Sequence, residues 1–252
     1  MRAITATLAQ GLRMGLAVSL CVLAAGAAAQ SPQAHAWAAA GPGATDPVKT
    51  ELAAVAATRP SKRANFGHEG VSPDARKVAD WVVDSGDSHG MPFVIVEKTD
   101  AKVYVFDAHG RLRGAARALL GLARGDESVP GIGTRKLSTI LPEERTTPAG
   151  RFVAALDKNL QGGEILWVDY DAAISLHPVI TTHPEERRAQ RLATASSSDK
   201  RISYGCINVP RAFFHRVVHP TFSRTNGVVY VLPEVRSLGE SFSFYDVDER
   251  AL

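Results

Sequence analysis

Cysteine is almost absent from this sequence, and it contains no internal repeat and no run of basic residues interleaved with aromatic ones. Its 252 residues include two cysteines, Cys21 and Cys206. Without a basic, aromatic-rich run the chain lacks the usual footprint of nucleic-acid binding, so nucleic acid is not expected as a partner. What is present is ordinary: 45% hydrophobic and 22% charged residues, enough for one sizeable core in a soluble globular protein.

The first thirty residues have the pattern of a secretory signal peptide. Arg2 and Arg13 are the only charged residues there, an apolar run covers 14–26, and the small residues 27–29 follow. We therefore expect a signal peptide at 1–29, export to the periplasm, association with the cell wall, and no stable membrane insertion after cleavage. An uncleaved membrane anchor is the alternative, although the run is short for crossing a bilayer. Loss of both arginines would lower the formal net charge from +3 to about +1, which weakens the case for an anionic partner.

Export gives the remaining cysteine a special status. Cysteines in an oxidising compartment usually pair, but after removal of residues 1–29 Cys206 has no cysteine left in the chain to pair with. A leftover cysteine of this kind forms an intermolecular bridge, is buried and inert, or is a reactive thiol.

Composition divides the rest of the chain into four segments. Residues 30–71, rich in Ala, Pro and Gly, are predicted to form a linker with one short helix at 51–57. Residues 72–90 form a helical lead-in, because Ser72 can cap a helix that begins at Pro73 and ends near Gly86. Residues 91–235 hold the main domain, and the acidic tail 236–252 is either a last edge strand or disordered.

The main domain is predicted to be mainly β. Short runs rich in β-branched and aromatic residues, separated by turn residues, indicate strands within 92–98, 102–112, 150–157, 164–171, 172–179 and 227–234. Only 210–219 has a helical pattern, with Phe213 and Val217 facing inward, Phe214 as a further candidate, and Pro220 ending the helix. Many short strands and few helices favour a mainly antiparallel sandwich or a barrel-like sheet.

The surroundings of Cys206 suit a nucleophile. A helix starting at Pro210 would direct its N-terminal amides toward the thiol and favour the thiolate. Gly205 permits a tight turn, so the amides of Tyr204, Gly205 and Cys206 could face an oxyanion. The alternative is that Gly205 is only a turn glycine and Cys206 a small core residue.

Cysteine catalysis also needs an imidazole, and the sequence leaves two candidates. His177 closes the apolar run 172–177 at a predicted strand end, whereas His183 lies in a polar, loop-like stretch. His215 and His219 stand four residues apart, a spacing that can hold a metal, but no third ligand accompanies them, so no metal site is expected. We therefore favour His177 as the base.

Two motifs resemble the L,D-transpeptidase (YkuD-type) catalytic domain. That family's signature has an upstream histidine, a spacer, and then Ser or Thr followed by His-Gly-Cys, a hydrophobic residue and Asn. In this sequence, the matching residues are Ser203, Gly205, Cys206, Ile207 and Asn208. The segment 147–152 (TPAGRF) is similar to the family's Thr-Pro-x-Gly-x-Phe strand entry, and the hairpin 93–112 to its opening hairpin. The resemblance covers 92–233 and implies a mixed β-sandwich with a few short helices.

The sequence departs from the family pattern in two ways. Tyr204 replaces the second histidine, and a phenol with a pKa near 10 cannot shuttle protons at neutral pH as imidazole does. The spacer is also long, with 25 residues between His177 and Ser203, whereas His183 would leave 19. Since loops absorb insertions at little cost, strand context still favours His177. The segment 178–202 would then be an enlarged loop over the site, acting as a lid, a substrate-selecting wall or a passive surface.

The resemblance implies acyl transfer on peptidoglycan stem peptides through a Cys206 thioester, with His177 as base and without a metal or organic cofactor. Ser203 would orient His177 or bind backbone, and Asn208 would cap the following helix. Two alternatives stay open. The thioester could serve hydrolysis or the attachment and release of wall proteins, or the domain could be an inactive peptidoglycan-binding module.

Overall fold

The computed structural model describes residues 60–250. The expected signal peptide at 1–29 and the linker up to residue 59, including the short helix expected at 51–57, lie outside the described residues.

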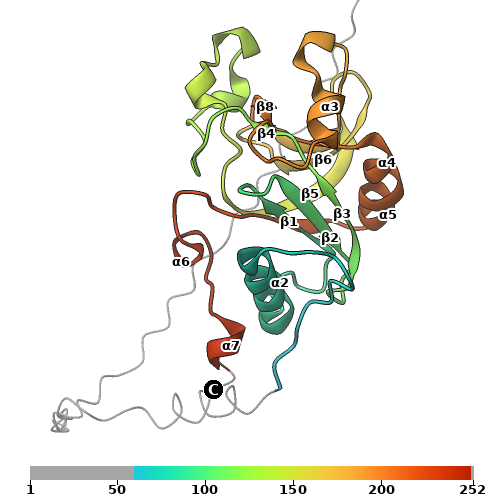
Figure 1. Cartoon of the computed structure of the whole chain (residues 1–252), viewed down its shortest axis with the longest axis vertical. Coiled ribbons are helices and arrows are strands. Elements are labelled where there is room, and N and C mark those ends of the chain that lie inside the picture. The colour runs from blue at the N-terminus through green and yellow to red at the C-terminus, as the bar shows by residue number, and fades with distance from the viewer. Residues whose placement is uncertain (1–59, 251–252) are drawn as a thin grey trace, which may run out of the picture. The chain divides into compact units, whose positions relative to one another are not determined.

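An eight-stranded mixed sheet forms the centre of the fold (Figure 1). Its order is β3-β2-β1-β10-β5-β6-β7-β9; the β1–β10 and β7–β9 pairs are parallel and the other pairs antiparallel. The strands are β1 (Phe93–Glu97), β2 (Lys102–Phe106), β3 (Leu112–Arg117), β5 (Gly150–Lys158), β6 (Glu164–Asp169), β7 (Ile174–Pro178), β9 (Ile207–Val209) and β10 (Gly227–Val231). The short strands β4 (Leu120–Gly121) and β8 (Arg201–Ser203) pair separately. The predicted mainly β fold with few short helices is confirmed.

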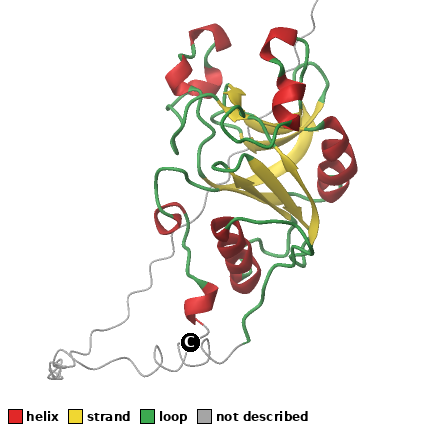
Figure 2. Ribbon diagram, viewed as in Figure 1, coloured by secondary structure: helices red, strands yellow, loops and turns green. Residues whose placement is uncertain are grey.

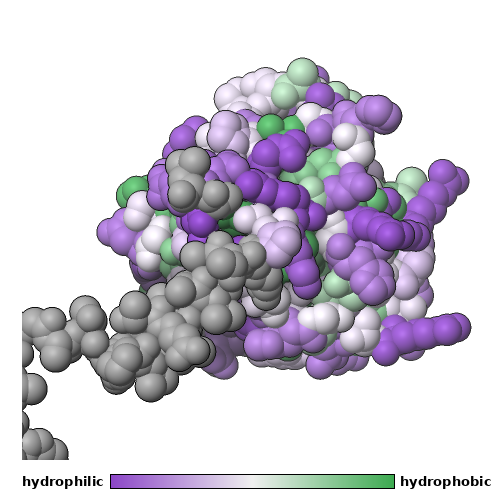
Figure 3. All heavy atoms as spheres, turned by 90° about the horizontal axis from the view of Figure 1, so that it is seen from below, coloured by the Kyte–Doolittle hydropathy of each residue, from purple (hydrophilic) through white to green (hydrophobic). Residues whose placement is uncertain are grey.

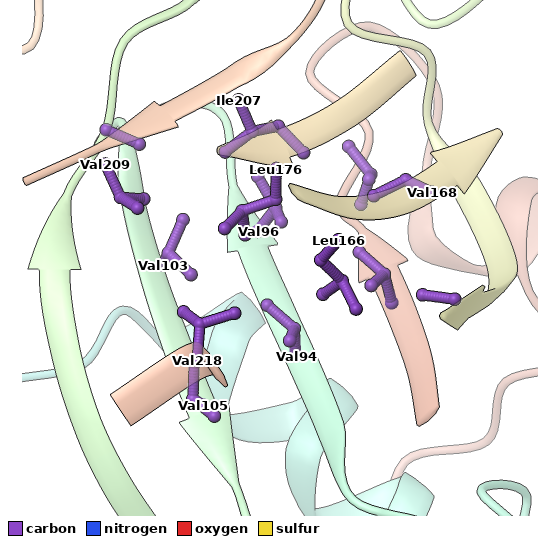
Figure 4. Packing of buried hydrophobic residues seen from close by; sticks show 14 of the residues in the cluster. Val94, Val96, Val103, Val105, Leu166, Val168, Leu176, Ile207, Val209 and Val218 are labelled. Atoms are coloured by element: carbon purple, nitrogen blue, oxygen red, sulfur yellow. The ribbon is translucent and has the colours of Figure 1, made fainter. Parts of the chain in front are cut away.

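Alternating side chains of the strands feed two hydrophobic clusters. Val94 and Val96 of β1 join one cluster, while Phe93 and Ile95 point to the opposite face and join the other. The first cluster also takes side chains from β2, β6, β7 and β9, so both ends of the sheet share one core (Figure 4). Strands β1 and β10 are buried on both faces, which explains why their residues are mostly apolar rather than alternating between apolar and polar.

One helix covers the second cluster. Helix α2 (Pro73–Ser85) begins where the sequence predicts: the Ser72 side chain accepts from the Ala75 amide at 3.1 Å, and Pro73 occupies the first turn. It ends at Gly86, which adopts φ +73°. The face that includes Val78 and Trp81 is buried against the sheet.

The helix after β9 is longer than predicted. Helix α4 (Arg211–Phe213) continues through a π-helical stretch, η5 (Phe214–Val218), into α5 (His219–Phe222), as the ribbon in Figure 2 shows. Pro220 therefore does not end the helix. Proline lacks the N–H that would bond the carbonyl four residues earlier in a regular α-helix, and the wider π-helical turn before Pro220 accommodates the missing bond. Phe214, Val218 and Phe222 are buried in the first cluster, and the expected inward residues Phe213 and Val217 pack against it partly buried.

Residues near both ends of the described region pack against the core. The expected linker already contributes to the core at Phe66, which packs edge-on against Phe106 at 5.1 Å between ring centroids. The tail is neither an edge strand nor disordered up to residue 250. It forms α6 (Leu238–Ser241) and α7 (Val247–Arg250), with Phe242 and Val247 buried beside α2. Its acidic residues include partners for α2, such as Asp246 at 2.8 Å from Lys77.

Within residues 60–250, no helix is both long enough and apolar enough to cross a bilayer. Hydrophilic side chains dominate the described part of the face in Figure 3, with apolar residues scattered among them.

The packing of the tail predicts a stability effect. Phe242 lies 6.2 Å from Trp81 and 6.0 Å from Tyr230 between ring centroids, so Phe242→Ala would leave a cavity in the second cluster. We expect a loss of about 3 kcal/mol in the free energy of unfolding, measured by urea denaturation. The exposed neighbour Val235 is the control, since Val235→Ala should change it by less than about 0.5 kcal/mol. Equal effects of the two changes would contradict a packed tail.

Candidate active site

The parallel pairing of β7 with β9 brings Cys206 and His177 together. Leu176 pairs with Ile207 and His177 with Asn208, so Cys206, directly before β9, lies opposite Ser175. Side chains two residues apart on a strand share a face, which places Ser175 and His177 on the same side of β7. The motif cysteine and the histidine from 29 positions earlier therefore meet at neighbouring strands of one sheet edge.

The thiol of Cys206 is half-buried and unpaired. Its Sγ lies 3.7 Å from the Ser175 hydroxyl and 3.6 Å from the Ala173 carbonyl oxygen. Burial acts to raise the pKa of Cys206, but its hydrogen bond with His177, the His177 charge, and the amide and hydroxyl of Ser175 lower it, and the net pKa is below its ordinary value. The site therefore favours the thiolate, which is the nucleophilic form.

The ring of His177 has a defined tautomer. Its Nδ1 lies 2.9 Å from the carbonyl oxygen of Pro178, and because a carbonyl only accepts, Nδ1 carries the proton and donates. Nε2 is left with a lone pair that can take the thiol proton. Burial acts to lower the pKa of His177, but the hydrogen bond with Cys206 and the thiolate charge raise it, and the net pKa is above its ordinary value.

The second candidate base lies elsewhere. His183 is exposed, and its Nδ1 is 3.1 Å from the carboxylate of Glu185. The structure thus brings His177, and not His183, to the thiol. Among residues 60–250, no group of three or more His, Cys, Asp or Glu side chains is arranged to hold a metal.

Gly205 is required by the turn before the cysteine. It adopts φ +127°, and a Cβ there would lie 2.6 Å from Ile174 Cδ1 and 2.7 Å from the Thr146 carbonyl oxygen. Its own carbonyl accepts from the buried Thr147 hydroxyl at 2.7 Å, and the same hydroxyl accepts from the Gly121 amide at 2.9 Å. Thr147 of the Thr-Pro motif therefore links the turn before Cys206 to Gly121 and holds that turn in place.

Two expectations about the turn are wrong. The Gly205 amide donates to the Ser203 hydroxyl at 3.1 Å, so only the Tyr204 and Cys206 amides of the expected trio remain for an oxyanion. Strand β9 separates Cys206 from the helix, which starts at Arg211, so the helix dipole does not act on the thiol directly. Partners on β7 stabilise the thiolate instead.

Ser203 and Asn208 support the turn and the base. The Ser203 hydroxyl donates to the Cys206 carbonyl at 2.6 Å, so of its two expected roles Ser203 has the one of binding the backbone. Asn208 is not a helix cap, because it lies within β9. Its Nδ2 donates to the Cys206 carbonyl at 3.2 Å and lies 3.4 Å from Nε2 of His177.

Tyr204 occupies the place of the second histidine of the resembled family. The guanidinium carbon of Arg145 lies 4.0 Å from its ring centroid, a cation–π arrangement that holds the ring without giving it a proton-transfer role.

Sequence reasoning missed Ser175 and Pro178, which contact the pair, and Arg145 and Arg188, which contact Tyr204 and Asn208. Period-two alternation from His177 could have revealed Ser175. The arginines come from separate segments, and no local pattern links them to the site.

No protein-family model matches the sequence, and a search of curated proteins finds no match. The solved structures similar to this chain are mostly L,D-transpeptidase catalytic domains. The E. faecium L,D-transpeptidase catalytic domain is 16% identical, with a TM-score of 0.33, 56% of this chain covered and 96% of that one.

Two further similar structures are matched over only part of their length. The helical cell shape determining protein Pgp2 of Campylobacter jejuni is 16% identical, with a TM-score of 0.40 and 64% of this chain covered. The L,D-transpeptidase LdtMt1, solved in complex with imipenem, is 15% identical, with a TM-score of 0.32 and 56% covered. This chain spans only 52% and 58% of their lengths.

The turn geometry predicts that Gly205→Ala abolishes reactivity of the thiol. The added methyl would meet a backbone oxygen that cannot move aside without displacing Thr147. Labelling of Cys206 by iodoacetamide at neutral pH, with folding followed by circular dichroism, measures this. Gly239→Ala is the control, since its Cβ meets nothing within 4 Å. Wild-type labelling of folded Gly205→Ala would contradict the assigned constraint.

The lowered pKa of Cys206 predicts a pH profile. Thiolate forms as pH rises through the thiol pKa, so alkylation of the wild type should reach half its maximum rate below about pH 8.5, the free-cysteine value. His177→Ala removes the hydrogen bond and charge that oppose burial, so its midpoint should move upward. A wild-type midpoint at or above the free value would contradict this electrostatic arrangement.

Proposed function

We propose that this chain is a cysteine acyltransferase of the L,D-transpeptidase type, acting on peptidoglycan stem peptides. The observation that carries the proposal is a half-buried, unpaired thiol of lowered pKa beside an imidazole whose Nδ1 holds the ring proton, so that Nε2 carries the lone pair. The motif resemblance supplies the substrate class, and the signal-like residues 1–29 supply the proposed location in the periplasm.

The first half-reaction forms a thioester. Nε2 of His177 takes the thiol proton, and the thiolate attacks the carbonyl carbon of the diamino acid in a tetrapeptide stem. The amides of Tyr204 and Cys206 are the donors proposed for the resulting oxyanion. As the C–N bond breaks, the imidazolium gives its Nε2 proton to the amine of the departing D-alanine, and the C–S bond remains.

The second half-reaction reverses these proton movements. An amine of a second stem attacks the thioester carbon, Nε2 accepts the proton of that amine, and the C–S bond breaks to release the thiolate. The product is a direct cross-link between two stems. Water or a wall-protein amine could enter by the same steps, and the identity of the acceptor is an outcome of the experiment below.

The proposal predicts release of D-alanine from a disaccharide-tetrapeptide, measured by mass spectrometry of the products. Cys206→Ala should abolish release, and His177→Ala should slow it by about 10²- to 10⁴-fold, the usual contribution of a general base. His183→Ala is the control and should behave as the wild type, since His183 does not contact Cys206.

The products separate the alternatives. Cross-linked dimers indicate transfer to a second stem, and free tripeptide indicates hydrolysis. Binding to sacculi without any release of D-alanine from wild-type protein would overturn the proposal in favour of an inactive binding module.

A further inference from the structure

The long segment between β7 and β8 reaches the site through one side chain. It contains a short 3₁₀ helix, η4 (Pro184–Glu186), and helix α3 (Arg188–Ala193), and Leu192 anchors it against Leu119 and Val179. Arg188, at the start of α3, is half-buried. Its Nη1 donates to Oδ1 of Asn208 at 2.7 Å, and its Nε donates to Glu186 at 2.5 Å.

Asn208 stands between this arginine and the base. Its side chain is fully buried, its Oδ1 faces Arg188, and its Nδ2 faces both His177 Nε2 and the Cys206 carbonyl. The backbone at Asn208 is itself fixed, because its amide and carbonyl both bond to Leu119 at 2.8 Å. With the backbone fixed, the remaining freedom of Asn208 is the rotation of its side-chain amide group.

The chemistry of the partners sets that rotation. A guanidinium has five donors and no acceptor, so the Asn208 atom that faces Arg188 must be the oxygen. The nitrogen then faces Nε2 of His177 and donates toward it, which stabilises the ring form with a lone pair on Nε2. A flipped amide would direct two donors at Arg188 and its oxygen at both Nε2 and the Cys206 carbonyl, so Arg188 and that carbonyl favour the same orientation. An oxygen facing Nε2 would favour a proton on Nε2.

We propose that Arg188 is a positioning residue: by orienting the Asn208 amide, it holds His177 in the form whose Nε2 can take the thiol proton. The inference rests on the proposed roles of Cys206 and His177. This role gives the segment 178–202 a function beyond that of a passive surface loop or a substrate-selecting wall. The position of α3 would then control the protonation of His177.

The charge of Arg188 acts on His177 in the same direction as its orienting hydrogen bond. Cys206 and Arg188 are the ionisable groups that act on its ring; the thiolate raises the pKa of His177 and the guanidinium lowers it. Glu186 faces Arg188 as its ion-pair partner. Removing Arg188 therefore removes a positive charge and an orienting donor, and both changes favour the imidazolium.

The experiment titrates the His177 ring by NMR in the full chain and follows D-alanine release in parallel. For Arg188→Ala we expect the pKa of His177 to rise above the wild-type value and kcat to fall about 10- to 100-fold, with KM little changed. Arg188→Lys, which keeps the charge and one donor, should restore part of both. The neighbour Arg187 is exposed, and Arg187→Ala should leave both at wild-type values.

Asn208→Asp separates orientation from anchoring. Aspartate keeps a strong link to Arg188 but cannot donate to Nε2, so we expect loss of kcat and a raised pKa of His177. Wild-type kcat in Asn208→Asp would overturn the inference. So would a His177 pKa in Arg188→Ala that stays unchanged or moves toward the ordinary value of about 6.5, since simple loosening of the site would do that. Because the titration needs no substrate, these results are distinct from a failure of D-alanine release in the wild type.

Discussion

The parallel register of β7 and β9 is the constraint on which the rest of the site depends. Because Leu176 lies opposite Ile207, the thiol falls beside Ser175 and the imidazole beside Asn208, and a shift of one residue would turn both away from each other. A three-residue strand at a sheet edge would be a weak support by itself. The backbone bonds between Asn208 and Leu119, and the Thr147 hydroxyl between Gly205 and Gly121, hold it from two more directions. Cys206 is therefore fixed before any substrate arrives.

The electrostatics of the site balance burial against pairing. Burial alone would keep both the thiol and the imidazole neutral, whereas their mutual hydrogen bond and charges favour the thiolate and the imidazolium. The carbonyl of Pro178 fixes the proton on Nδ1, and Asn208, oriented by Arg188, lies against Nε2. The proposed reaction assigns no proton transfer to Tyr204, whose ring lies against Arg145, and uses a single histidine supported by the Pro178 carbonyl and Asn208.

Local sequence patterns predict the parts of this fold that are locally encoded. The strand runs, the capped helix at Pro73 and the pairing of His177 with Cys206 follow from alternation, capping residues and one motif. Features set by distant packing could not be predicted. The tail 236–252 is acidic, yet Phe242 and Val247 are buried against α2, and the helix runs past Pro220 because a π-helical turn accommodates it. Arg145 and Arg188 reach the site from segments without any motif, and β9 displaced the expected helix start from the thiol.

The claim that Cys206 is an acylatable nucleophile activated by His177 is tested most directly with a carbapenem, whose strained lactam carbonyl suits attack by a thiolate. The measurement is the intact mass of the protein over time, followed by peptide mapping. We predict one adduct on Cys206, absent in Cys206→Ala and formed much more slowly in His177→Ala. An adduct that maps to another residue, no adduct at all, or equal rates with and without His177 would contradict the claim.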